Sequence, residues 1–366
     1  WYAEEVVRTE GHMGIAPASG ARTLVYQKPA GIAVLVTPWN YPAAMATRKI
    51  APALAAGCPV VIKPASETPL TMLALMPLLE EAGVPPGVVN VLPSRSSGAV
   101  VGAMLADPRA RVVSFTGSTE VGRKLLHAAA DTVIKPAMEL GGNAPFIVFD
   151  DADLDAAAEG LMIAKMRNLG EACTAANRIY VHAAVEAEFV EKYTARMAAL
   201  KMGDGLDPSV DVEPLINAET RDKVAAFVDD ALARGAQLRL GGERPKGPGF
   251  YYPPTVLTNV PDEAECLKDE IFGLVAALQS FTDEDEIIAR ANQTEYGLVA
   301  YVFTGDMQRG LRVSEQLECG MVGLNRGLVS DPAAPFGGVK QSGLGREGGK
   351  EGMLEFMETQ YISTNW

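Results

Sequence analysis

The chain has 366 residues, of which 48% are hydrophobic and 21% charged, so it is long enough for two or three domains and too apolar to be disordered. Its 32 basic and 46 acidic residues give a net charge of −14, which excludes the basic surface that nucleic-acid binding requires and disfavours anionic membranes. Because of this charge we expect no nucleic-acid partner. The sequence also has no apolar run of 18 or more residues, so we expect no membrane span.

The cysteines and histidines are too scattered for a disulfide framework or a zinc site. We therefore expect no bound metal and a reducing compartment, the cytoplasm. The four cysteines are Cys58, Cys173, Cys266 and Cys319.

Strands and helices alternate from about residue 30. The apolar run 31–37 predicts a strand buried on both faces, and a helix over 42–56 follows, with Pro42 in its first turn and Gly57 as its stop. This alternation predicts an α/β fold with a parallel sheet covered by helices on both faces, and a cofactor crevice at the carboxyl ends of the strands. Further strands are expected at 59–63, 88–92 and 111–115, and a helix at 69–82.

A second α/β segment runs from about 144 to 340. Strands are expected at 144–149 and 178–181, and a helix begins at Asp153 and ends near Arg167. Amphipathic helices are expected at 184–200 and 219–234, and a late strand at 355–364.

Two glycine-rich stretches are candidates for phosphate binding. Residues 343–348 match GxGxxG literally, but no strand precedes them, which argues against a dinucleotide fingerprint. Residues 115–122 follow a strand and begin a helix, so the backbone N–H groups there suit a pyrophosphate. An ordinary strand-to-helix turn has the same sequence pattern and is the alternative.

Three side chains have the chemistry of a catalytic site. Cys173 lies among small residues after a helix and is a candidate nucleophile, whereas the other cysteines fit small buried core residues. Glu139 ends a strand before two glycines and is a candidate base, or else a surface acid. Asn40 follows the first strand and can donate to an oxyanion, or else it is a turn residue between prolines.

Seven motifs in register along residues 25–360 together resemble those of the aldehyde dehydrogenases, most closely the succinate-semialdehyde branch. They are PWNYP (38–42), IKP (62–64), FTGST (115–119), ELGG (139–142), GEAC (170–173), EIFG (270–273) and PFGGVKQSG (335–343). The family usually has Gln where Glu171 stands and Pro where Leu274 stands, and we expect small effects from both departures.

The resemblance implies an oxidation through a cysteine thioester. Cys173 attacks the aldehyde, Asn40 and the Cys173 N–H hold the oxyanion, Glu139 activates the hydrolytic water and Lys49 relays protons. Arg48 and Arg167, with Ser330, are expected to bind a distal substrate carboxylate.

The resemblance also implies a nicotinamide cofactor. Lys63 matches the adenosine-ribose position, and Ser66 stands where many NAD-preferring relatives carry Glu, so NADP is expected to be preferred over NAD. The remaining cofactor-binding positions implied by the motifs are Trp39, Gly117, Ser118, Glu270 and Phe272.

Four segments are expected. They are a remnant of an amino-terminal helix and oligomerisation hairpin (1–29), a cofactor domain (30–141), a catalytic domain (142–341) and a carboxy-terminal segment with an oligomerisation strand (342–366). The family's first quarter is expected to be missing ahead of Trp1, and a homodimer or homotetramer is expected for the full-length chain. Alternatives are oxidation of glutarate semialdehyde or another aldehyde, and an inactive truncated relative acting as a structural or binding protein.

Overall fold

The computed structural model describes all residues, 1–366, and divides into two compact units. Unit 1 comprises residues 1–140, 330–337 and 343–366, and unit 2 comprises residues 141–329 and 338–342. No helix is both long enough and apolar enough to cross a membrane.

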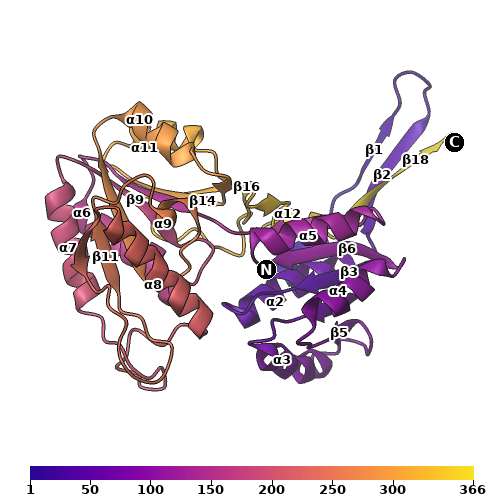
Figure 1. Cartoon of the computed structure of the whole chain (residues 1–366). Helices are drawn as coiled ribbons and strands as arrows, with labels where there is room; N and C mark the ends of the chain where they lie inside the picture. The colour runs from indigo at the N-terminus through magenta and orange to yellow at the C-terminus, as the bar shows by residue number, and fades with distance from the viewer. The chain divides into compact units, whose positions relative to one another are not determined.

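Unit 1 is built on a six-stranded sheet in the order β17-β7-β6-β3-β4-β5, which is parallel except for β17 (Figure 1). Helices α2 and α3 pack on one face and α4 and α5 on the other, as the alternating pattern predicts. The bounds are β3 (Ile32–Val36), α2 (Pro42–Ala56), β4 (Val60–Lys63), α3 (Pro69–Glu81), β5 (Val89–Val91), α4 (Ser97–Ala106), β6 (Ala110–Thr116), α5 (Thr119–Ala130), β7 (Lys135–Glu139), β17 (Gly343–Leu344) and α12 (Glu351–Leu354).

Local chemistry explains the predicted bounds of α2. Pro42 occupies its first turn, where the missing N–H costs nothing, and Gly57 ends it in the left-handed conformation at φ 85°. The strand before it, β3, lies between β4 and β6 and buries Ala33 to Val36 on both faces, which is why this stretch is continuously apolar.

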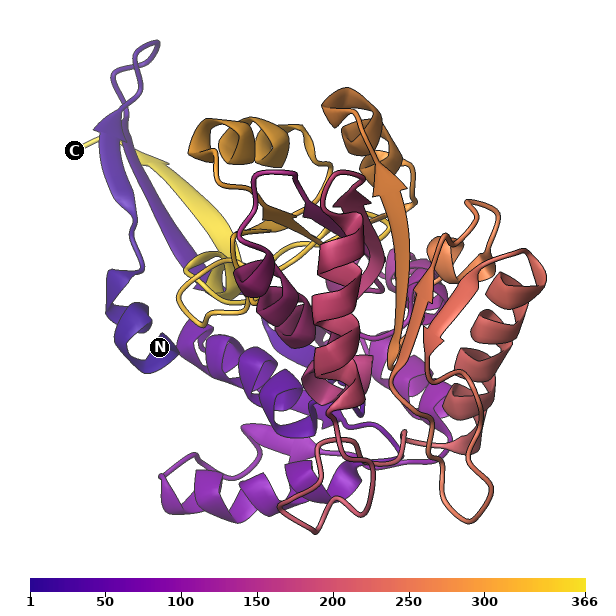
Figure 2. The same ribbon diagram turned by 90° about the vertical axis from the view of Figure 1, so that its left-hand side faces the viewer.

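A three-stranded antiparallel arm also belongs to unit 1. Strand β18 (Met357–Thr364) pairs along its whole length with β2 (Arg22–Pro29), and β1 (His12–Ile15) pairs on the other side of β2. Figure 2 shows the yellow final strand beside the indigo amino-terminal strands. The short elements α1 (Tyr2–Glu5) and η1 (Val6–Arg8) precede the arm.

Unit 2 contains a seven-stranded sheet in the order β10-β11-β12-β9-β8-β14-β15, in which only β10 is antiparallel. Helices α10 and α11 pack against β8, β9 and β14, and α8 packs against β11 and β12. The strands are β8 (Ala144–Val148), β9 (Ala176–His182), β10 (Gln237–Leu240), β11 (Thr255–Thr258), β12 (Val275–Phe281), β14 (Val299–Phe303) and β15 (Met321–Leu324), with the small pair β13 (Tyr296–Gly297) and β16 (Val339–Lys340). The helices are α6 (Leu154–Met166), η2 (Arg167–Gly170), α7 (Glu186–Ala198), α8 (Ala218–Ala233), α9 (Glu265–Lys268), α10 (Glu284–Asn292) and α11 (Met307–Gln316).

Candidate active site

In unit 1 the candidate polar groups lie where parallel strands end. Glu139 is the last residue of β7 and is paired in register with Thr116 at the end of β6. Asn40 lies in the turn between β3 and α2, and Lys49 follows on α2. The strand order places β3 next to β6 and β6 next to β7, so these three candidates come from adjacent elements at one edge of the sheet.

Lys49 is buried in a polar cluster that the sequence did not reveal. Its side chain is 1% exposed, and its Nζ donates to Ser114 Oγ at 3.0 Å and to the carboxylate of Glu347. Glu347 lies in the glycine-rich stretch 343–348, and its backbone forms a bridge with Phe336. A carboxylate within that stretch carries no sequence signal of its contact with α2, so the pairing with Lys49 was missed.

Glu139 has the electrostatic setting of a base. It is 4% exposed, and burial first, followed by the negative charge of Glu347, raises its pKa well above the usual value. Lys49, Arg346 and Arg48 act in the opposite direction. A carboxylate with a raised pKa accepts a proton more readily near neutral pH, as general-base catalysis requires.

Arg48 on α2 and Ser330 are in direct contact. The Arg48 Nη2 donates to Ser330 Oγ at 2.8 Å, and its guanidinium stacks 4.5 Å from the centre of the Phe336 ring. Arg48 Nη1 also lies 3.8 Å from Glu347 Oε2. Arg48 is therefore held in one orientation and is not a solvated helix charge.

The turn between β6 and α5 is closely packed against the end of β7. The Gly117 N–H donates to the Glu139 carbonyl at 3.1 Å, and a Cβ on Gly117 would lie 2.4 Å from the Phe115 ring. Ser118 is the N-cap of the twelve-residue α5 and accepts from the Val121 N–H at 3.4 Å. In the other glycine-rich stretch, 343–348, residues Gly343 and Leu344 form the edge strand β17, which pairs with β7.

Lys63 is the last residue of β4, and Ser66 lies in the loop that follows this strand. Lys63 is 4% exposed, and burial lowers its pKa while the charge of Glu67 opposes that effect. Ser66 is exposed and donates its hydroxyl to Glu67 Oε2 at 3.1 Å. The residue at position 66 carries no charge itself, and its hydroxyl lies against the carboxylate of Glu67.

In unit 2 a left-handed turn precedes the candidate nucleophile. Three successive residues, Asn168, Leu169 and Gly170, have φ of 51°, 58° and 74°. The turn directs the chain from α6 toward half-buried Cys173. A Cβ on Gly142 would lie 2.4 Å from the Cys173 carbonyl oxygen, so only glycine fits beside this turn.

Glu270 lies against the same glycine segment. Its Oε1 accepts from the Gly142 N–H at 3.2 Å, and burial raises its pKa to about 7. The Gly142 N–H and the charges of Lys223 and Lys165 oppose the rise. The structure therefore gathers Cys173, Gly142 and Glu270 in unit 2, with Phe272 on the loop that follows Glu270.

Arg167 lies at the carboxyl end of α6 with an exposed side chain, and it belongs to unit 2, whereas Arg48 and Ser330 belong to unit 1. Among the other cysteines, Cys58 and Cys266 are buried as expected, but Cys319 is half-buried. Burial raises the pKa of the Cys319 thiol to about 11, which keeps it unreactive near neutral pH.

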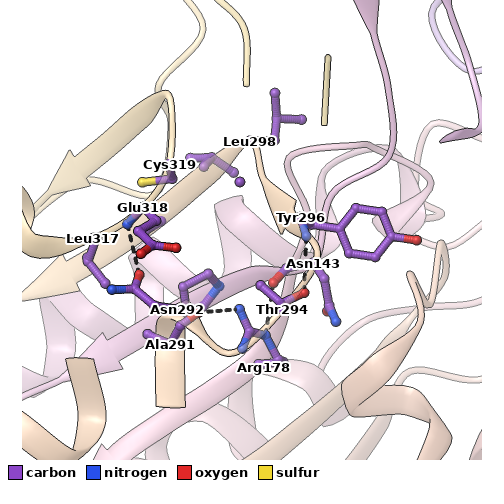
Figure 3. Close-up of a pocket in the computed structure, with 14 residues that line it drawn as sticks. Asn143, Arg178, Ala291, Asn292, Thr294, Tyr296, Leu298, Leu317, Glu318 and Cys319 are labelled. Carbon is purple, nitrogen blue, oxygen red and sulfur yellow. Dashed lines mark hydrogen bonds between the residues drawn. The ribbon is translucent and has the colours of Figure 1, made fainter. Parts of the chain in front are cut away.

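A cavity of about 10 Å³ in unit 2 lies beside buried Arg178 and Asn143 (Figure 3). Arg178 donates to the carbonyls of Asn143 and Ala291, both at 2.9 Å, and so anchors the chain that enters β8. This volume accommodates about one water molecule, so the cavity is too small for an aldehyde substrate.

Mainly parallel sheets that carry a half-buried cysteine and a buried carboxylate place the chain in the α/β class, with side chains suited to a cysteine-dependent enzyme. The Aldehyde dehydrogenase family model matches residues 1–362, and the chain belongs to that family.

Individual relatives are similar over nearly the whole chain. Succinate-semialdehyde dehydrogenase of Paenarthrobacter nicotinovorans is 54% identical over 99% of this chain and 80% of its own length. Glutarate-semialdehyde dehydrogenase of Pseudomonas aeruginosa is 48% identical over 99% of this chain and 75% of its own. A crystal structure described as an NADP-dependent enzyme of Escherichia coli has a TM-score of 0.98 and 48% identity, covering 100% of this chain and 76% of that one.

Proposed function

We propose that the chain oxidises succinate semialdehyde, or a similar short semialdehyde acid, to the dicarboxylic acid with NADP or NAD through a thioester on Cys173. The relatives named for semialdehyde dehydrogenases support this substrate class. The alternative of an inactive structural protein has no support among them. The observation that carries the substrate class is the fixed contact of Arg48 with Ser330, because a guanidinium beside a hydroxyl suits a carboxylate.

Cys173 supplies the nucleophile in the proposed reaction. Its thiolate adds to the aldehyde carbon, and the resulting oxyanion accepts hydrogen bonds from the Asn40 amide and the Cys173 N–H. A single donor of this kind is worth roughly 2.7–4 kcal/mol in the transition state. Addition of sulfur converts the aldehyde into a hemithioacetal, from which hydride departs to leave the thioester.

Glu139 then takes a proton from the water that attacks the thioester, which releases the acid and restores the thiol. Lys49 and Glu347 are the groups through which that proton leaves, because Lys49 is buried against Glu347 and the charge of Glu347 acts on Glu139. Glu347 thus joins the candidate site as a residue that transfers protons.

The nicotinamide cofactor, when bound, accepts the hydride. Gly117, Ser118 and the first turn of α5 are assigned to its pyrophosphate, and Lys63 and Ser66 to its adenosine ribose. Glu270 is assigned to the nicotinamide ribose, with Trp39 and Phe272 packing against the cofactor. The uncharged residue at Ser66 and the NADP-dependent relative support NADP as the preferred form.

Substrate selection tests the proposal. Arg48→Ala and Arg167→Ala are each expected to raise KM for succinate semialdehyde at least tenfold, because a charge-assisted hydrogen bond is worth roughly 1.5–3 kcal/mol. Ser330→Ala should raise KM less. Butanal, which has the same chain length without the carboxylate, should be oxidised equally by the variants and the unaltered chain.

Steady-state rates with the four- and five-carbon semialdehyde acids rank succinate against glutarate semialdehyde, which differ by a methylene worth about 1–3 kcal/mol.

Arg95→Ala serves as the control for the arginine variants, because this arginine is exposed in a loop of unit 1. Equal losses on butanal and on the semialdehyde acids would refute the assignment of the arginines.

We further propose that residues 30–141 bind the cofactor, that residues 142–341 carry the catalytic cysteine, and that residues 1–29 and 342–366, which contain the three-stranded arm, mediate homodimer or homotetramer assembly. The arm supports this role because Met13, Ile15 and Tyr361 expose more than half of their side-chain area. The wide spacing of the cysteines supports a cytoplasmic location.

A further inference from the structure

Glu171 places a carboxyl group two residues before Cys173. The side chain is 5% exposed, so the group is removed from water. A buried carboxyl so close to a nucleophilic thiol has consequences that an amide would not have.

The backbone around Glu171 is fixed on both sides. The Glu171 N–H donates to the Asn168 carbonyl at 2.8 Å, and Asn168 Nδ2 donates to the Glu171 carbonyl at 3.1 Å. The preceding Gly170 has φ 74°, and a Cβ there would lie 2.3 Å from the Gly273 carbonyl oxygen. The turn has little freedom to move Glu171 away from Cys173.

The side chain of Glu171 connects this turn to a second loop. Its Oε1 accepts from the Ile216 N–H at 3.1 Å. Burial raises its pKa to about 7, and the Ile216 hydrogen bond is the opposing influence.

The titratable and charged groups on the elements that meet here are Lys165 and Arg167 around the end of α6, Glu213 on the loop before α8, Lys223 on α8, Glu270 on the loop after α9, and Cys173.

We propose that Glu171 is a positioning residue for Cys173, whose side chain fastens the nucleophile turn to the loop at Ile216 and whose ionisation makes the Cys173 thiol harder to deprotonate. This proposal rests on the assignment of Cys173 as the nucleophile. It differs from the expectation of a small effect at this position, and the measurements below decide between the two.

Proximity sets the size of the effect. The Cα atoms of residues 171 and 173 lie at most about 7 Å apart, and a negative charge on Glu171 opposes ionisation of the nearby thiol. For a separation of about 10 Å between the carboxylate and the sulfur, with an effective dielectric constant of about 20, the expected shift in the thiol pKa is about one unit.

Alkylation measures this shift without any catalytic turnover. The intact chain is treated with iodoacetamide over a range of pH, and modification of the peptide that contains Cys173 is followed by mass spectrometry. In Glu171→Gln, which keeps the acceptor for Ile216 but removes the charge, the midpoint should fall by about one pH unit. Glu213→Gln removes an exposed charge from the neighbouring loop and should leave the midpoint unchanged.

Hydrogen exchange tests the positioning role separately. The Ile216 N–H should stay protected in Glu171→Gln and exchange faster in Glu171→Leu, which lacks an acceptor. An unchanged alkylation midpoint in Glu171→Gln, an equal shift in Glu213→Gln, or equal protection in Glu171→Leu would overturn the proposal. The nucleophile assignment fails independently if Cys173→Ser retains aldehyde oxidation while the alkylation results stand.

Discussion

At the scale of single residues, the buried carboxylate of Glu139 is assigned to the second half of the reaction. Its raised pKa suits proton abstraction from water, whereas thioester formation needs the thiol and a hydride acceptor but no attacking water. These two steps are therefore separable by one substitution that preserves the shape of the side chain.

We expect Glu139→Gln to slow thioester hydrolysis by about 10²–10⁴-fold, the usual contribution of a general base, while hydride transfer continues. Stopped-flow absorbance should show a burst of reduced cofactor followed by almost no steady turnover. If the burst disappears as well, Glu139 acts before the thioester and the assignment is wrong.

Sequence and structure differ most where a polar residue is held by tertiary contacts. Asn40 and Cys173 were identified because short motifs carry them, but Glu347 was missed because its partner Lys49 lies 298 residues away. The structure also buries Lys165 of α6 completely, where its Nζ donates to Asn177 on β9. No local pattern encodes such distant pairings.

At the scale of elements, strand β3 and helix α2 were predicted almost to the residue because burial on both faces and terminal proline and glycine mark them. The arm strands β1 and β2 have no such signal, because their side chains are mostly exposed or half-buried and their pairing depends on β18. Family resemblance alone indicated a hairpin there.

Close packing of α5 on β7 is testable with two glycines in one unit. A Cβ on Gly122 would lie 2.4 Å from Leu140 Cδ2, whereas Gly102 on α4 has open space around it. Gly122→Ala should lower the free energy of unfolding by roughly 1–3 kcal/mol through overpacking, and Gly102→Ala should raise it by roughly 0.5–1 kcal/mol. Urea denaturation measures both, and a gain in stability for Gly122→Ala would show that α5 does not pack as described.

The contact of α6 with β9 depends on pH through Lys165, whose Nζ donates to Asn177 Oδ1 at 3.1 Å. Burial lowers its pKa to about 7, below the value of roughly 10.4 in an unfolded chain. Between these values the unfolded chain binds one more proton, so the free energy of unfolding rises with pH, by a few kcal/mol in total.

Lys165→Met removes this dependence. Guanidinium unfolding at pH 6.5 and 9 should show that the stability of the variant relative to the unaltered chain is higher at pH 6.5 and falls toward pH 9. Lys201→Met, at an exposed lysine, should show the same difference from the unaltered chain at both pH values. A Lys165→Met difference that also stays constant would contradict the lowered pKa.

At the scale of the whole molecule, unit 1 is assembled from distant parts of the chain. Phe356, Met353 and Met357 share a core with residues of α2, β3 and β4, and the Cys58 thiol donates to the Phe356 carbonyl at 3.2 Å. Unit 2 has its own core around α8, β11 and β12.

Phe356→Ala should therefore destabilise unit 1 by roughly 3–5 kcal/mol, as expected for a large core side chain. Native-state hydrogen exchange should accelerate in β3 and leave β12 unchanged. Equal acceleration in both strands would show that the two units unfold together.

The pairing of β18 with β2 has a consequence during synthesis. During translation, residues 1–140 leave the ribosome first, and unit 2 is synthesised next. Strand β18, which pairs with β2, is synthesised only after unit 2. The partner of β2 is β18 and the partner of buried Lys49 is Glu347, and both are synthesised some three hundred residues later. Unit 1 therefore lacks these contacts in the nascent chain. In the proposed mechanism, proton transfer through Glu347 therefore cannot begin until residue 347 has been synthesised and has paired with Lys49.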